Sequence, residues 1–168
     1  MTTDEKMEFV IELAEKAMDN GEFPIAAAVY NGDELVSSAY TTERADGRFL
    51  VHAELKALLD ADMMKFPYKT RAQLELYTNL EPCLMCLGAV MSSFISKVYF
   101  ALEAPEDGAV DLVRSEFERR KVTGLPAYHF PEVTGGLLRE RSIQLFKDFV
   151  ERNQGKPGVE FAQSLASL

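Results

Sequence analysis

Two cysteines, Cys83 and Cys86, stand three positions apart in the segment NLEPCLMC, directly after Pro82. Proline suits the first turn of a helix, and residues three apart on a helix lie on the same face. The helix dipole at that end favours thiolates, which are good ligands for zinc. The spacing alone fits a redox pair or two small buried apolar side chains equally well. It predicts a metal site only together with further ligands.

A histidine and a glutamate, His52 and Glu54, stand two positions apart in the segment LVHAEL. On a regular helix such residues point in different directions. At the very start of a helix, where the backbone is still half extended, both side chains can reach one cavity. Taken alone, the histidine fits a structural role and the glutamate fits a contact with the helix N-terminus.

Together these four residues have the composition of a catalytic zinc site. His52, Cys83 and Cys86 supply three ligands, and a catalytic zinc has three protein ligands and one position open for water. A structural zinc needs a fourth ligand, and the remaining histidine, His129, lies far along the chain and is expected to be structural. Glu54 supplies the acid–base group of a hydrolytic site. His-x-Glu followed by Pro-Cys-x-x-Cys is the signature of zinc-dependent deaminases.

The elements that must position these residues alternate between helical and strand patterns, which predicts an α/β domain. A capping box at Thr2 and Glu5 opens the first helix, and Asn31-Gly32 predicts a hairpin. The stretch 103–121 is acidic and less regular. This order implies a three-layer α/β/α sandwich around one sheet. Helices are expected near 2–20, 52–63, 83–94 and 136–152, and strands near 25–30, 34–40, 73–78, 96–102 and, at a sheet edge, 126–133.

Length and composition predict one globular domain. The chain has 168 residues, of which 47% are hydrophobic, and we place the domain at residues 1–152 with a linker and short tail at 153–168. No apolar run has the length of a membrane span. The N-terminal residues are acidic and lack the apolar segment of a secretory signal, so a cytoplasmic location is expected.

Beyond the two motifs, the sequence resembles the cytidine and deoxycytidylate deaminase superfamily over roughly residues 7–152. The likeness is carried by ELAEKAMDNGEFPIAAAV, YTNLEPCLMCLGAVMSSFISKVYF and VTGGLLRERSIQLFKDFV. It is nearest to the tRNA adenosine deaminases and the bacterial cytosine and guanine deaminases. The resemblance implies the cytidine deaminase-like fold, with a mixed five-stranded sheet, and a homodimer.

The resemblance also implies the chemistry. His52, Cys83 and Cys86 would hold one Zn²⁺ per chain, and Glu54 would carry protons from the attacking water to the ring nitrogen and the departing amine. The net reaction converts an amine to a carbonyl and releases ammonia. Positions that would contact the substrate are Ile25, Thr41, Val51 and Ala53.

The substrate side departs from the family pattern. Relatives usually carry Asn eleven positions before the zinc histidine, where this chain has Thr41, and Asp-Pro-Thr where it has residues 49–51. The loop 103–107 is acidic, the tail is not basic, and the formal net charge is −9. These features argue against nucleic acid, whose binding depends on clustered Lys and Arg. A small aminated heterocycle, such as a free nucleobase or nucleoside, is therefore the expected substrate.

Three alternatives remain open. The first is a tRNA adenosine deaminase, because the overall resemblance to that group is strong. The second is an inactive, zinc-stabilised interaction domain, against which the intact Glu54 argues. The third is a thioredoxin-like redox protein, which leaves both His52 and Glu54 unexplained.

Overall fold

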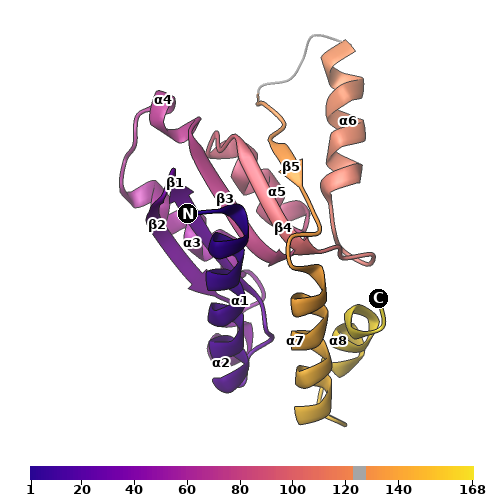
Figure 1. Cartoon of the computed structure of the whole chain (residues 1–168). Coiled ribbons are helices and arrows are strands. Elements are labelled where there is room, and N and C mark those ends of the chain that lie inside the picture. Colours follow the sequence, from indigo (N-terminus) through magenta and orange to yellow (C-terminus); the bar gives the residue numbers. More distant parts are fainter. Residues whose placement is uncertain (123–127) are drawn as a thin grey trace.

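The computed structural model describes residues 1–122 and 128–168, and its described strands form a five-stranded sheet (Figure 1). β1 pairs antiparallel with β2 and β3, whereas β4 is parallel to both β3 and β5, so the predicted mixed sheet is confirmed. The strands lie in the order β2 (Glu34–Tyr40), β1 (Ala26–Asn31), β3 (Leu74–Leu80), β4 (Lys97–Leu102) and β5 (Glu132–Thr134).

Helices cover both faces of the sheet and complete the predicted three layers. Alternation along β1 separates two cores, because Ala28 and Tyr30 pack into one and Ala27 and Val29 into the other. The first core is covered by α1 (Thr3–Asp19), α7 (Arg139–Arg152) and α8 (Val159–Ala166), and the second by α3 (Ala53–Met63) and α5 (Leu84–Ser92).

Two local sequence signals have the expected geometry. The Thr2 hydroxyl accepts from the Glu5 N–H at 3.2 Å, and the Thr2 backbone N–H donates to the Glu5 carboxylate at 2.7 Å, which is the predicted capping box. Gly32 has φ 56° in the turn between β1 and β2, a left-handed conformation that glycine adopts without steric cost.

The structure adds helices that the sequence did not predict. The acidic stretch expected to be irregular contains α6 (Val110–Val122), where Glu116 pairs with Arg119 at 2.6 Å and Asp111 with Arg114 at 3.0 Å. Such pairs one turn apart support a helix despite its low hydrophobicity. Two four-residue helices, α2 (Glu43–Asp46) and α4 (Tyr68–Arg71), lie in connecting segments. Within residues 1–122 and 128–168, no helix is long and apolar enough to cross a membrane.

The C-terminal part of the chain closes one end of the molecule. The predicted edge strand is present only as β5, and residues 126 and 127 of the expected range lie outside the described residues. In the predicted tail, α8 packs beside α7 and buries Ala162 and Leu165 in the first core. The division of the chain at residue 152 stays a prediction.

A buried ion pair joins the first helix to the sheet. The Lys6 ammonium lies 2.9 Å from the Glu75 carboxylate, and only 5% of Lys6 is exposed. The same ammonium lies over the rings of Tyr30 and Tyr77, at 5.2 and 5.3 Å from their centroids. Because the charge is both paired and placed on aromatic faces, its burial is compensated.

Candidate active site

Two helix starts bring the four predicted residues together. His52 is the N-cap of α3 and Cys83 the N-cap of α5, and both have extended backbone conformations. Glu54 and Cys86 follow in the first turns of the same helices, so each pair spans the change from extended to helical chain. Pro82, which was expected in the first helical turn, lies two positions before α5, because this helix begins at Leu84.

The three predicted ligands have the spacing of a tetrahedral zinc site. Nδ1 of His52 lies 3.6 Å from Sγ of Cys83 and 3.6 Å from Sγ of Cys86. Bonds of about 2.1 Å to nitrogen and 2.3 Å to sulfur, at a tetrahedral angle, place these atoms about 3.6 Å apart. All three ligand atoms lie within 4.8 Å of one another, so the residues fit a zinc ion.

The metal-binding group within the described residues has three members and does not include His129. That histidine is exposed and lines a different, smaller pocket beside Tyr68 and Phe94. Three ligands leave a fourth position for water or substrate, as catalytic zinc sites have.

Glu54 is buried next to the predicted ligands. It is 4% exposed, and its carboxylate is 3.7 Å from the Cys86 sulfur. The Thr78 hydroxyl lies 3.5 Å from this carboxylate and 3.1 Å from the Leu80 carbonyl, which is its nearer acceptor. Burial raises the pKa of Glu54 from 4.5 to about 7, which is near the value that suits an acid–base group at neutral pH.

The charges of the ligands depend on one another. A hydrogen bond from Cys86, with a further contribution from His52, lowers the pKa of the Cys83 thiol to about 4. The hydrogen bond with Cys83 raises the pKa of the His52 imidazole to about 9, although burial opposes this. A thiolate at Cys83 is the ionisation state that zinc binding requires.

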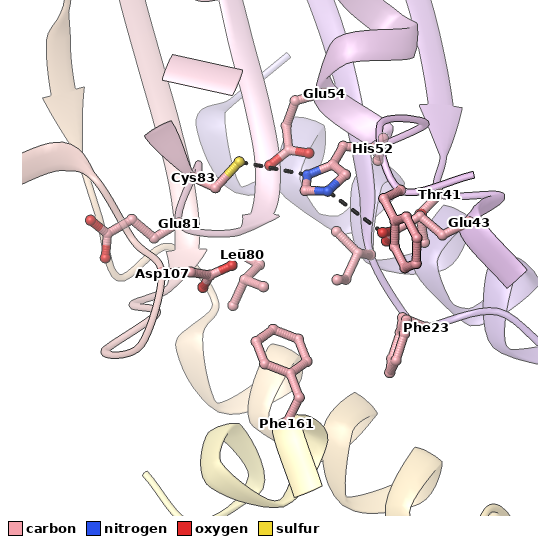
Figure 2. Close-up of a pocket in the computed structure, with 13 residues that line it drawn as sticks. Phe23, Thr41, Glu43, His52, Glu54, Leu80, Glu81, Cys83, Asp107 and Phe161 are labelled. Carbon is pink, nitrogen blue, oxygen red and sulfur yellow. Dashed lines mark hydrogen bonds and ion pairs between the residues drawn. The ribbon is translucent and has the colours of Figure 1, made fainter. Parts of the chain in front are cut away.

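A cavity of about 300 Å³ opens beside the predicted ligands. Figure 2 shows His52, Glu54 and Cys83 at one end and the rings of Phe23 and Phe161 at the other, with Asp107 and Glu43 on opposite sides. The lining residues are Phe23, Ile25, Thr41, Glu43, Phe49, His52, Ala53, Glu54, Leu80, Glu81, Cys83, Asp107 and Phe161.

The predicted substrate-contact positions are mostly in this cavity. Ile25, Thr41 and Ala53 line it. Val51 is buried, and its carbonyl instead accepts from the Thr42 N–H at 3.4 Å, which holds the chain leading to His52. Whether these residues contact a substrate stays a prediction.

Several residues that line the cavity were not predicted from the sequence. Asp107 lies in the acidic loop 103–107 and is exposed, but its side chain also lines the cavity, where partial burial raises its pKa. Glu81 fixes that loop, because its carboxylate accepts from the N–H groups of Ala104 and Val110 at 3.1 Å each. Phe161 lies in the predicted tail, and no local signal in the sequence indicated that it would reach the cavity.

A match to a known protein family covers the same four residues. The chain matches the family model described as "Cytidine and deoxycytidylate deaminase zinc-binding region" over residues 1–102. The matched part contains His52, Glu54, Cys83 and Cys86. Asp107 and Phe161 lie beyond it, so part of the cavity wall is outside the matched region.

Two curated relatives illustrate the similarity. A tRNA-specific adenosine deaminase of Bacillus subtilis is 31% identical over 141 residues, covering 83% of this chain and 84% of that protein. A tRNA-specific adenosine deaminase of Haemophilus influenzae is 30% identical over 161 residues, covering 95% and 90%.

Solved structures share the fold. One, from a study of A-to-I editing by tRNA:A34 deaminases, is 26% identical with a TM-score of 0.69, covering 84% of this chain and 98% of that chain. Another, crystallised in complex with 8-azaguanine, is 25% identical with a TM-score of 0.72, covering 88% and 84%.

Proposed function

This chain belongs to the cytidine and deoxycytidylate deaminase family, and we propose that it deaminates a small aminated heterocycle, such as a free nucleobase or nucleoside. The observation that carries this proposal is the cavity itself, whose polar walls beside the ligand set are carboxylates and whose far end is aromatic. Such a site suits a flat, uncharged ring that bears N–H donors.

The chain's own residues divide the work of the reaction. His52, Cys83 and Cys86 would hold zinc, which when bound would supply the Lewis acidity that makes water nucleophilic near neutral pH. Glu54 accepts one proton of the attacking water and passes it to the ring nitrogen. It then takes the remaining proton from the hydroxyl group of the adduct and delivers it to the departing amine. Water and the amine are consumed, and a carbonyl and ammonia are formed, without an oxidant or reductant.

Charge favours a small substrate over an anionic polymer. Glu43 and Asp107 lie on opposite sides of the cavity, and the loop from Glu103 to Asp107 is acidic. A phosphate placed at this rim meets like charges, which are costly to bring together. Phe23 and Phe161 instead offer apolar faces to a flat ring. The similar protein crystallised with 8-azaguanine supports a cavity of this kind for a free base analogue.

Deamination of adenosine in tRNA is the second candidate. The names of the curated relatives support it more directly than they support a small substrate, since both proteins described above are tRNA-specific adenosine deaminases. Against it stand the net charge of −9 and the carboxylates at the rim.

A competition assay separates the two candidates. The zinc-loaded protein is given an anticodon stem-loop bearing adenosine together with a panel of aminated bases, nucleosides, pteridines and triazines, at physiological salt, and ammonia and product are measured. Release of ammonia from a small molecule supports the first candidate. Efficient deamination of the stem-loop, with every small molecule ignored, overturns it in favour of tRNA. If no substrate releases ammonia, the inactive interaction domain is the remaining candidate.

We also propose a homodimer, which the family resemblance implies. Large apolar side chains are exposed beside the cavity and on its helices, with Phe49 at 86%, Leu50 at 63% and Leu84 at 60%. In homodimers, large apolar side chains such as these are buried at the interface with the partner. The expected cytoplasmic location stays a prediction.

A further inference from the structure

The imidazole of His52 contacts different partners through its two nitrogens. Nδ1 faces the sulfurs of Cys83 and Cys86, whereas Nε2 lies 3.6 Å from a carboxylate oxygen of Glu43 on the opposite side (Figure 2). Both side chains are mostly buried, with 28% of His52 and 23% of Glu43 exposed. The distance is that of an ion pair, and a shortening of a few tenths of an ångström makes it a hydrogen bond.

Glu43 is held in this position by its neighbours. The Thr41 hydroxyl lies 3.2 Å from the second carboxylate oxygen of Glu43 and donates to it. The same hydroxyl lies 3.4 Å from the Val51 carbonyl, its alternative acceptor next to His52. Thr41 is 1% exposed, so it has few conformations available. A residue at the position where relatives usually carry a substrate-contacting Asn is thus engaged with the surroundings of the zinc histidine.

Hydrogen bonds also hold the short helix α2, which carries Glu43. The carboxylate of Glu22, which is 2% exposed, accepts from the N–H groups of Arg44 and Ala45 at 3.0 and 2.7 Å. On the other side, the Lys56 ammonium of α3 donates to the Thr42 hydroxyl at 3.0 Å. These contacts fix α2 against both the turn after α1 and helix α3.

We propose that Glu43 is the positioning residue for His52, and that Thr41 and Glu22 hold it in place. A zinc-bound imidazole that uses Nδ1 carries its proton on Nε2. Glu43 accepts that proton in a hydrogen bond, which fixes the ring orientation and makes Nδ1 a stronger ligand. Thr41 therefore contributes to zinc binding as well as to the cavity wall. This inference rests on the zinc site and is independent of which heterocycle is deaminated.

Zinc affinity is the first readout. Zinc-loaded wild type, Glu43→Ala and Glu43→Gln are titrated with a chromogenic chelator, and Asp107→Asn is the matched control because it removes a cavity carboxylate that lies across from His52. We expect Glu43→Ala to lose about tenfold or more in zinc affinity, as removal of such partners does in other zinc proteins. Glu43→Gln keeps an acceptor oxygen and should lose less, and Asp107→Asn should match wild type.

The second readout is the Nε2 proton itself. The chain has two histidines, so ¹⁵N-correlated NMR of zinc-loaded protein gives two imidazole systems. We expect a slowly exchanging Nε2 proton on His52 in wild type and Glu43→Gln, and fast exchange with water in Glu43→Ala. Thr41→Val, which removes the hydroxyl and keeps the side-chain shape, should lie between them and serves if Glu43→Ala does not fold.

Two results would overturn the proposal. One is wild-type zinc affinity together with a protected Nε2 proton in Glu43→Ala, or the same two results in Thr41→Val if the alanine variant is unfolded. The other is a loss of zinc affinity in Asp107→Asn as large as that in Glu43→Ala. That result would assign the effect to the loss of a negative charge near the site, and not to the contact between Glu43 and His52. Neither readout involves a substrate, so failure of the proposed deamination would be seen separately.

Discussion

The ring of Phe161 packs edge-on against the ring of Phe23, with centroids 6.0 Å apart and planes at 85°. Phe161 belongs to α8, near the end of the chain, and Phe23 to the segment between α1 and β1. Both rings line the cavity, so a helix in the predicted tail forms part of its wall.

Replacing Phe161 with alanine is expected to weaken substrate binding more than turnover. The variant loses an apolar wall far from Glu54, and we expect KM to rise about tenfold, equivalent to about 1.4 kcal/mol, with kcat little changed. Steady-state kinetics on the substrate found in the competition assay measure this. Leu168→Ala, an exposed change in the same tail, is the control. An unchanged KM in Phe161→Ala would mean that the substrate does not reach this wall.

Replacing Glu54 with glutamine is expected to abolish most of the activity and leave the metal in place. Glu54 is not in the ligand set, and glutamine has nearly the same shape but cannot carry protons. General acid–base catalysis alone contributes about 10²–10⁴ to rate, and Glu54 serves several proton transfers, so the loss should be at least that large. Zinc content, unfolding temperature and ammonia release are measured on one sample, with the exposed Asp60→Asn as control. Activity close to wild type would assign the proton transfers to another group.

Replacing Cys83 with alanine should have the opposite pattern, with loss of both zinc and stability. Removing one of three ligands lowers zinc affinity, and the binding free energy that supports the folded state is lost with it. Wild-type protein should contain one zinc per chain by elemental analysis and should unfold at a lower temperature after chelation. A variant that keeps stoichiometric zinc would show that the ligand set is wrong.

The ion pair between Lys6 and Glu75 predicts a pH-dependent stability. Burial raises the pKa of Glu75, but hydrogen bonds from Lys6, Lys97 and Tyr77 outweigh this and hold the pKa below 4.5. The ionised form is therefore favoured in the folded state, and its stabilisation is present above pH 4.5 and lost as the pH falls through the lowered pKa.

We accordingly expect Glu75→Gln to be less stable than wild type by about 2 kcal/mol at pH 7. The difference should shrink as the pH falls below 4.5, because Glu75 of wild type is then also uncharged. Urea unfolding across the pH range tests this, with the exposed Glu34→Gln as control. A difference that grows at acid pH would contradict the assigned sign.

The grouping of the candidate ligands was predictable because the sequence signal for each pair of residues is local. Cys83 and Cys86 are constrained by one helix turn, and His52 and Glu54 by one helix start. The contacts of Glu43 were not predictable in the same way. The chain folds back at α2, a four-residue helix without a hydrophobic pattern, and this brings Glu43 to the imidazole.

The layers of the fold were predictable from alternation and capping signals, whereas the cavity walls were not. Asp107 reaches the cavity because Glu81, a residue after β3, fixes the loop after β4. Phe161 reaches it because α8 packs on α7. Such positions depend on contacts between distant parts of the chain, about which hydrophobic periodicity carries no information.

The ligands are unevenly spread along the chain. Cys83 and Cys86 are neighbours on one helix turn, whereas His52 lies 31 positions before Cys83. An unfolded chain can therefore hold zinc weakly through its two cysteines, and the imidazole joins only when β3 has brought the start of α5 beside the start of α3. Zinc bound to the unfolded state offsets part of the stabilisation that zinc gives to the folded state. Zinc should therefore raise the free energy of unfolding by less than its affinity for the native site implies.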